Sequence, residues 1–510
     1  MSRFGDWSVA ANTASGQFEL SRIAARTTSF EAARGGLSLE RWPSLETVIR
    51  LYDTAHAEIR ELRLREPGRL SVYVCGPTVY DLPHLGHGRY TLVWDVARRW
   101  FSFRGLDVRF VSNITDIDDN IINRALRDGL SEHEVAATYE AEWWRAMDLL
   151  GVARPSDVPH ATAWVDAMVD LISSFLENDV AYAISDGLYF DVSRVHDYGL
   201  LAGQPLESLR AGARIEASDE KRSPLDFALW KFAKAGEPSW PAPFGAGRPG
   251  WHTECVVMSL GLLGDGFDLH TGGFDLKFPH HENERAQALA AGRVFAQHWG
   301  HSGWVMVGQE KMSKSLGNFT SLTHLLETTD ARAYRLLVLR SHYRSPIEVT
   351  TAIIADAERS LDRLDSLARR FELPALAGAT LEVASSHALG DAGHALLARV
   401  GALLDEDLDT PGAVATLFEA VSSTNSEADL GNTELARDLA AAINVLFGAL
   451  GLPLLGSSDL VDDQSAQLVR HRDEARGDKN WARADELRDQ LVARGWVVED
   501  STSGTQIRRL

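Results

Sequence analysis

A regular pattern of hydrophobic and polar positions begins near Leu70. Residues 70–74 (LSVYV) are an apolar run that predicts a buried strand, and residues 87–103 repeat their apolar positions with a helical period. A second strand is predicted at residues 108–112 and a second helix at residues 119–128. Strand, helix, strand and helix at this spacing indicate an α/β fold with a doubly wound parallel sheet of the Rossmann type.

The predicted sheet is interrupted and then resumes. Alternation with aromatic residues at 181–192 predicts a hairpin, and the Pro- and Gly-rich residues 237–250 predict a loop. Strands and helices alternate again from 252 to about 300. We therefore expect a Rossmann-type domain over residues 49–325, with an insertion at about 160–245.

The second half of the chain is mainly helical in pattern. From 330 to 450 apolar residues recur with a helical period, most clearly at 354–371, which predicts an α-helical bundle over residues 326–460. Residues 464–510 predict one charged helix and then a hairpin, and so a small C-terminal α+β module.

Two other stretches need a separate interpretation. Residues 1–48 mix acidic and basic side chains, unlike a transit peptide, and we expect a poorly ordered N-terminal extension. The longest apolar stretch, 439–456, is interrupted by Asn444, glycines and Pro453. It therefore predicts a bundle helix and its exit, with no membrane span.

Charge excludes one class of function. The 510 residues include 51 basic and 72 acidic side chains, a net charge of −21. The protein therefore does not bind nucleic acid through global positive charge, although local basic patches remain possible. The balance favours a cytoplasmic protein that stays apart from anionic membranes.

The start of the first predicted helix carries His84, Gly86 and His87. A helix N-terminus offers unpaired N–H groups and a positive dipole end, which attract phosphate. Two histidines three residues apart can donate to the same polyphosphate, and Gly86 leaves room for a flat base. By itself this short motif fits two surface histidines at a helix cap equally well.

A polar segment far downstream carries Lys311 and Lys314 in the sequence KMSKS, residues 311–315. Two lysines on a loop suit the spread negative charge of a phosphoryl group under attack. Alone, such a loop is usually only a solvated surface, but its combination with the histidine motif in an α/β chain is more specific.

The two motifs in this order resemble those of the class I aminoacyl-tRNA synthetases. Within that class, further segments resemble the cysteinyl-tRNA synthetases, from about Leu51 to the C-terminus. One position departs from the family pattern, because Leu85 stands where Ile is usual. The segments that carry the resemblance are 73–80 (YVCGPTVY), 113–118 (NITDID), 250–255 (GWHTEC), 269–273 (LHTGG) and 278–284 (FPHHENE).

The resemblance implies a two-step reaction. L-Cysteine attacks the α-phosphorus of ATP to give cysteinyl adenylate, and the acyl group then passes to the 3′ end of tRNA(Cys). The resemblance assigns catalysis, together with Mg²⁺, to His84, His87, Lys311 and Lys314. It assigns ATP binding to the same four residues and Gly86, with Lys314 contacting the phosphates most directly.

The chain has only two cysteines, Cys75 and Cys255, which excludes a disulfide framework. His280 and Glu284 are four residues apart and share a helix face. Spacing alone favours two buried, inert thiols, and a single disulfide also remains open. The resemblance instead implies that Cys75, Cys255, His280 and Glu284 hold one Zn²⁺ per chain.

Zinc would solve a problem of selection. Cysteine and serine are near isosteres, which a hydrophobic pocket separates poorly, whereas zinc prefers a thiolate. Four protein ligands are typical of a closed structural site. We therefore expect Glu284 to be the weak ligand.

The resemblance also implies an amino-acid pocket. Each residue has a structural alternative: Trp251 as core, Thr115 as a strand-end residue, and His270 as a satisfied buried histidine. The residues assigned to substrate binding are Cys75, Gly76, Thr115, Trp251 and His270.

The C-terminal segment is where we expect RNA contact. Residues 465–510 hold nine basic and eight acidic side chains in a strongly acidic chain, and they resemble an anticodon-binding module. Trp481 shares a predicted helix face with Ala484 and Leu487, which predicts core packing. The basic residues along the predicted helix are Arg470, Arg472, Arg476, Arg483 and Arg488.

Other functions remain open at this point. A cysteine ligase of mycothiol synthesis, which acylates glucosaminyl-inositol, resembles the same core but lacks the C-terminal module. A non-catalytic RNA-binding relative would have lost a histidine or lysine of the two motifs, and a protein with only structural zinc would unfold without it. The expected partners are tRNA(Cys), L-cysteine and ATP, with no membrane, and we expect a monomer.

Overall fold

The computed structural model describes residues 48–203, 220–307, 310–311, 321–376, 389–456, 463–501 and 504–509. Residues 49–510 form one compact unit, to which the following description applies. The predicted N-terminal extension lies outside the described residues, apart from Val48.

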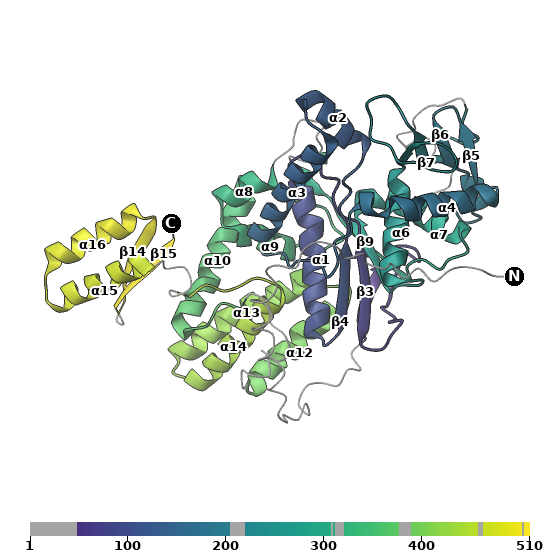
Figure 1. Cartoon of the computed structure of the whole chain (residues 1–510). Helices are drawn as coiled ribbons and strands as arrows, with labels where there is room; N and C mark the ends of the chain where they lie inside the picture. Colours follow the sequence, from purple (N-terminus) through teal and green to yellow (C-terminus); the bar gives the residue numbers. More distant parts are fainter. Residues whose placement is uncertain are drawn as a thin grey trace, which may run out of the picture. The chain divides into compact units, whose positions relative to one another are not determined.

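A four-stranded parallel sheet forms the centre of the unit, and the doubly wound prediction is confirmed. From β3 the chain crosses through helix α1 (Leu85–Phe103) to β4, and it later returns to β9 on the other side of β3 (Figure 1). The strand order therefore reverses between β3 and β9, the place where open α/β sheets bind ligands. The strands, in spatial order, are β10 (His298–Ser302), β9 (Leu269–Gly273), β3 (Arg69–Val74) and β4 (Asp107–Ser112).

Helices connect and cover the strands. Two helices, α2 (Asp119–Asp128) and α3 (Glu132–Leu149), follow β4, and two more, α6 (Trp251–Leu263) and α7 (Glu282–Ala290), flank β9. Before β3, the antiparallel pair β1 (Arg50–Asp53) and β2 (Glu58–Glu61) opens the unit.

The insertion has its own antiparallel sheet. Helix α4 (Val165–Glu177) leads into the hairpin, which is confirmed, and the predicted loop at 237–250 ends in a short strand. That strand escaped prediction because its pairing partner lies in β7, a contact that local composition does not encode. The strands are β5 (Ala181–Ile184), β6 (Gly187–Phe190), β7 (Phe227–Phe232) and β8 (Gly247–Pro249).

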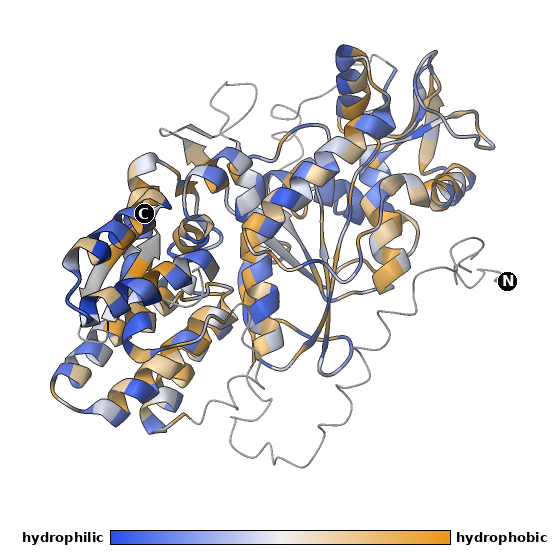
Figure 2. Cartoon of the chain, turned by 60° about the vertical axis from the view of Figure 1, so that its left-hand side comes forward, coloured by the Kyte–Doolittle hydropathy of each residue, from blue (hydrophilic) through white to orange (hydrophobic). Residues whose placement is uncertain are grey.

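The helical bundle is confirmed in outline. Helix α10 buries Ile354, Leu361 and Leu364 on one face, as its period predicts. Figure 2 shows hydrophobic and hydrophilic residues alternating along the helices, the pattern of amphipathic helices. No helix within the described ranges is long and apolar enough to cross a membrane. The helices are α8 (Leu322–Thr328), α9 (Ala331–Leu339), α10 (Thr351–Phe371), α12 (Asp391–Asp405), α13 (Thr410–Asp429) and α14 (Thr433–Ala449).

The C-terminal module contains two helices, so the prediction of one helix was wrong. Lys479 turns the chain with a positive φ of 58°, and Asn480 caps the second helix by accepting from the Arg483 N–H. The hairpin is confirmed. The elements are α15 (Asp463–Gly477), α16 (Trp481–Ala493), β14 (Trp496–Ser501) and β15 (Gly504–Arg509).

Two side chains of this module also differ from prediction. Trp481 is the first residue of α16 and is 59% exposed, so its expected core packing was wrong. Arg472 is buried and donates to Thr505 Oγ1 at 2.6 Å, which joins α15 to the hairpin.

Candidate active site

The two cysteines meet at the carboxyl end of β3. Cys75 directly follows that strand and Cys255 lies in the second turn of α6, with their Sγ atoms 3.6 Å apart. Glu284 of α7 approaches Cys75 Sγ at 3.4 Å, and His280 Nε2 lies 2.9 Å from Glu284 Oε1. The four donor atoms lie within 4.8 Å of one another, and all four residues are buried.

The side chains of this cluster shift one another's pKa values. Burial raises the pKa of Cys75, and the neighbouring Cys255 thiol raises it further. Burial would also raise the pKa of Cys255, but hydrogen bonds from Cys75 and His280 lower it to about 6. His280 and His270 hold the pKa of Glu284 well below its usual range despite burial. Thiolate, imidazole and carboxylate are the donors that zinc prefers, so the residues fit such an ion.

A second donor set overlaps the first. His270 of β9 lies 2.7 Å from Glu284 Oε2 and 4.0 Å from Cys75 Sγ. With His281 it completes a set that shares Cys75 and Glu284 with the predicted ligands. His270 was predicted for the amino-acid pocket, and the structure places it against a predicted metal ligand. The sequence did not predict this second set. It also did not predict a role for His301, whose Nε2 atom lies 2.9 Å from Nδ1 of His281.

The other predicted pocket residues surround the cluster. Gly76 packs so closely that an added Cβ would overlap the carbonyl oxygen of Asn113, so only glycine fits there. Thr115 Oγ1 donates to Glu254 Oε2 at 2.7 Å. The ring of Trp251 stacks on that of His280, with centroids 4.0 Å apart.

Sequence reasoning missed Asn113 and Glu254. The Asn113 side chain accepts from the Gly76 N–H at 2.8 Å and from Cys255 Sγ at 3.7 Å. Burial raises the pKa of Glu254 well above its usual range, although the hydrogen bond from Thr115 opposes this. Both residues lie inside segments that carry the family resemblance, which is the only signal that could have indicated them.

The histidine motif forms the N-terminal cap of α1. His84 Nδ1 accepts from the His87 N–H at 3.1 Å, and the His84 N–H donates to His87 Nδ1 at 3.3 Å. The rings stack with centroids 3.7 Å apart. Gly86 lies in the same first turn, and all three residues are half-buried. This reciprocal cap gives both rings one defined orientation at a helix N-terminus.

The lysine motif is described only at its first residue. The backbone of Lys311 lies in β12 (Glu310–Lys311), which pairs with β11 (Val305–Val307). Lys314 lies outside the described residues. Past the motif, Ser321 forms a β-bridge with His84.

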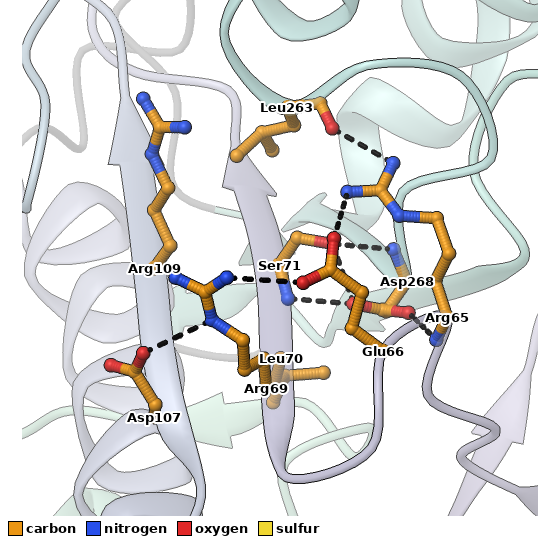
Figure 3. Close-up of a pocket in the computed structure, with 9 residues that line it drawn as sticks. All are labelled: Arg65, Glu66, Arg69, Leu70, Ser71, Asp107, Arg109, Leu263 and Asp268. Atoms are coloured by element: carbon orange, nitrogen blue, oxygen red, sulfur yellow. Dashed lines mark hydrogen bonds and ion pairs between the residues drawn. The ribbon is translucent and has the colours of Figure 1, made fainter.

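Two cavities lie near the central sheet, one beside the start of α6 and one at the amino ends of two strands. One, of about 250 Å³, adjoins Trp251 and His252 and reaches Lys231 of β7 in the insertion. The other, of about 100 Å³, lies at the amino ends of β3 and β4 and is lined by Arg65, Arg69 and other charged side chains (Figure 3).

The fold and the catalytic region define a class. The model of the family described as tRNA synthetases class I (C) catalytic domain matches residues 61–359, more than half of the chain. Mycobacterium tuberculosis methionyl-tRNA synthetase in complex with methionyl-adenylate aligns with a TM-score of 0.53 and 15% identity, over 75% of this chain and 91% of that one. An Agrobacterium radiobacter LeuRS–tRNA–LeuAMS complex aligns with a TM-score of 0.56 and 12% identity, over 76% and 85%. The catalytic fold is that of a class I aminoacyl-tRNA synthetase.

Curated relatives narrow the class. The cysteine–tRNA ligases of Chromobacterium violaceum and Dechloromonas aromatica are each 42% identical over 467 residues, which is 91% of this chain and 100% of each relative. That of Clostridioides difficile is 38% identical over 469 residues, with the same coverage. A cysteinyl-tRNA ligase anticodon binding domain matches residues 459–508, and a DALR domain matches 399–455. The chain belongs to the cysteine–tRNA ligase family and is a ligase that charges tRNA with cysteine.

Proposed function

We propose that the enzyme selects L-cysteine with a zinc ion held by Cys75, Cys255, His280 and Glu284. One observation carries this proposal. The chain's only two cysteines, 180 positions apart in sequence, meet in the fold beside an imidazole and a carboxylate. A zinc ion bound there would supply a soft Lewis acid that prefers the substrate thiolate to a serine hydroxyl.

The protein residues orient the amino acid. Trp251 stacks on His280 and covers one side of the cluster, while Thr115 holds Glu254 on another side. Gly76 lets the backbone after Cys75 approach Asn113 closely. His270 binds Glu284 Oε2 and so restrains the carboxylate that we expect to be the weak ligand.

ATP is held at the start of α1. The cap uses the Nδ1 atoms of His84 and His87, which directs the Nε2 edges of both rings outward from the cap. The helix dipole and the two rings offer positive potential to the phosphates, with Gly86 beside the base. Lys311 and Lys314, with Mg²⁺, neutralise charge as the cysteine carboxylate attacks the α-phosphorus.

The acyl acceptor is the 3′ end of tRNA(Cys), recognised in part by the C-terminal module. Exposed Trp481 and Arg483 lie in the first turn of α16, where an aromatic ring and a guanidinium can stack on unpaired bases. A cysteine ligase that acylates glucosaminyl-inositol would need no such module. We expect the enzyme to act in the cytoplasm as a monomer.

One preparation tests the proposal. Metal analysis should find about one zinc per chain, and ATP–pyrophosphate exchange should depend on cysteine and reject serine. The product cysteinyl adenylate should then acylate tRNA(Cys) and not glucosaminyl-inositol. A metal-free enzyme that still selects cysteine over serine would refute the zinc site, and acylation of the amino sugar would refute the acceptor.

A further inference from the structure

Arg89 of α1 is a buried cation whose described contacts are all backbone carbonyls. It lies two residues after His87 and is 1% exposed. Its guanidinium donates to the carbonyl of Trp304 at 2.8 Å, to that of Tyr343 at 3.2 Å and to that of Ser345. Among the described residues no carboxylate pairs with it. Burial lowers its pKa to about 10, so the charge costs stability at this position.

The carbonyls that Arg89 binds belong to the segments that lead into two strands beside the first residue of the lysine motif. Trp304 directly precedes β11, whose Met306 pairs with Lys311 of β12. Tyr343 and Ser345 lie in the segment that leads into β13 (Ile347–Glu348), four and two residues before its start, and β13 pairs in parallel with β11. One guanidinium therefore joins the helix that begins at the two histidines to the segments that lead into two strands of the sheet that contains Lys311.

The first turns of α1 are fixed from the other side as well. Tyr334 Oη donates to the Leu85 carbonyl at 2.6 Å. A Cβ at Gly88 would come within 2.9 Å of the Leu322 side chain, and the Leu322 N–H donates to Pro83 at 2.9 Å. The histidine end of α1 thus has a fixed position, against which Arg89 can hold β11.

We propose that Arg89 is a positioning residue for adenylate formation: it sets β11 and β12, and with them Lys311, at a fixed distance from His84 and His87. The proposal rests on the ATP-binding roles proposed above for those residues. Histidines and lysines from separate elements must meet the same phosphates, and a displacement of about 1 Å costs about 100-fold in rate. A lysine at position 89 would keep the charge but could not span the four carbonyls that Arg89 reaches, which include that of His342.

The test is Arg89→Lys, followed in both half-reactions. We expect the kcat of ATP–pyrophosphate exchange to fall about 10- to 100-fold, with a raised KM for ATP. The KM for cysteine, the metal content and the single-turnover transfer from preformed cysteinyl adenylate to tRNA should stay within about twofold, because the metal cluster and acceptor site are untouched.

Arg335→Lys is the matched control. Arg335 is also 1% exposed, but it pairs with Asp95 and donates to the Leu150 and Gly151 carbonyls, outside the strands around Lys311. This variant should lose stability without changing the ratio of exchange to transfer. If Arg89→Lys lowers both half-reactions equally, or neither, Arg89 is not a positioning residue.

If Arg89→Lys does not fold, a second variant alters the same segments that lead into β11 and β13. A Cβ at Gly303 would lie 2.5 Å from the Ser345 carbonyl oxygen, so Gly303→Ala should displace the same strands and lower exchange selectively. Lys314→Ala separates this inference from the proposed function. If it lowers exchange while Arg89→Lys and Gly303→Ala do not, only the inference fails; if exchange survives Lys314→Ala, the proposed ATP site fails.

Discussion

The two ends of the central sheet differ in how their charged and polar side chains are partnered. At the amino end, Asp268 accepts from the Arg65 N–H at 2.6 Å and from the Ser71 N–H at 2.7 Å, and Arg69 pairs with Glu66 at 3.1 Å (Figure 3). The buried carboxylate there is satisfied by backbone N–H groups, and the exposed arginine and glutamate pair with one another.

At the carboxyl end, the donors crowd together instead. Two thiols, a carboxylate and several histidines lie within a few ångströms, and the pKa of Cys255 is lowered while that of Cys75 is raised. This donor set is compatible with a metal ion, whereas the charged groups of the amino-end pocket pair with one another or with backbone N–H groups. The comparison teaches that the two ends differ in how their polar groups are partnered, and not in whether a cavity is present.

The largest expected effect is at the carboxyl end. Cys255→Ser removes a soft donor, so we expect zinc content to fall, cysteine-dependent exchange to drop at least about 100-fold, and discrimination against serine to weaken. Metal analysis and exchange assays check this. Arg69→Ala, at the exposed rim of the amino-end pocket, is the control and should leave zinc content, exchange and discrimination unchanged. Equal losses in both variants would contradict the functional difference between the two ends of the sheet.

The next effect concerns phosphate chemistry. Lys314→Ala should lower adenylate formation about 100- to 1,000-fold, because it removes positive charge from the α-phosphorus in the transition state. The KM for cysteine should change little. ATP–pyrophosphate exchange at varied cysteine and ATP checks both statements, and an unchanged exchange rate would contradict the assigned role.

At the amino end we expect loss of stability without loss of catalysis. Asp268→Asn replaces one carboxylate oxygen by an NH2 group, so either the Arg65 or the Ser71 backbone N–H loses its acceptor, and the free energy of unfolding should fall by about 1–3 kcal/mol. Denaturant unfolding measures this change. The kcat/KM of the folded enzyme should equal that of the wild type, and a fall in it would give this end of the sheet a catalytic role.

The smallest expected effect is a pH dependence. Burial, with His270 nearby, lowers the pKa of His301 to about 3 in the folded protein, against about 6.5 when unfolded. Below about pH 6.5 the unfolded chain takes up a proton that the folded chain refuses, so stability falls as pH falls. His301→Gln should remove about 1 kcal/mol of this loss between about pH 6.5 and 5.5. Urea unfolding at several pH values measures the free energy of unfolding of both proteins. If it changed with pH equally in the wild type and in His301→Gln, the burial argument would be contradicted.

Local pattern predicted most of the fold. The strand at 70–74, the helix at 119–128 and the buried face of α10 were all readable, because apolar periodicity records which side of an element faces the core. The prediction of elements failed where an element depends on a contact with residues distant in the sequence or on a single unusual backbone conformation. The strand β8 depends on β7, and the turn at Lys479 depends on a single left-handed residue and a cap.

By itself, the sequence determined the doubly wound core, the histidine motif at 84–87, the lysine motif at 311–315 and the presence of only two cysteines. Only the tertiary structure decided that Cys75 and Cys255 lie 3.6 Å apart, that Asn113 and His270 lie beside them, and that Arg89 joins α1 to the residue before β11. The physical reason is that periodicity is a property of neighbouring residues. Contacts between residues 180 positions apart are set by which strands pair and on which side the chain returns, and those choices are made by the packing of the whole domain.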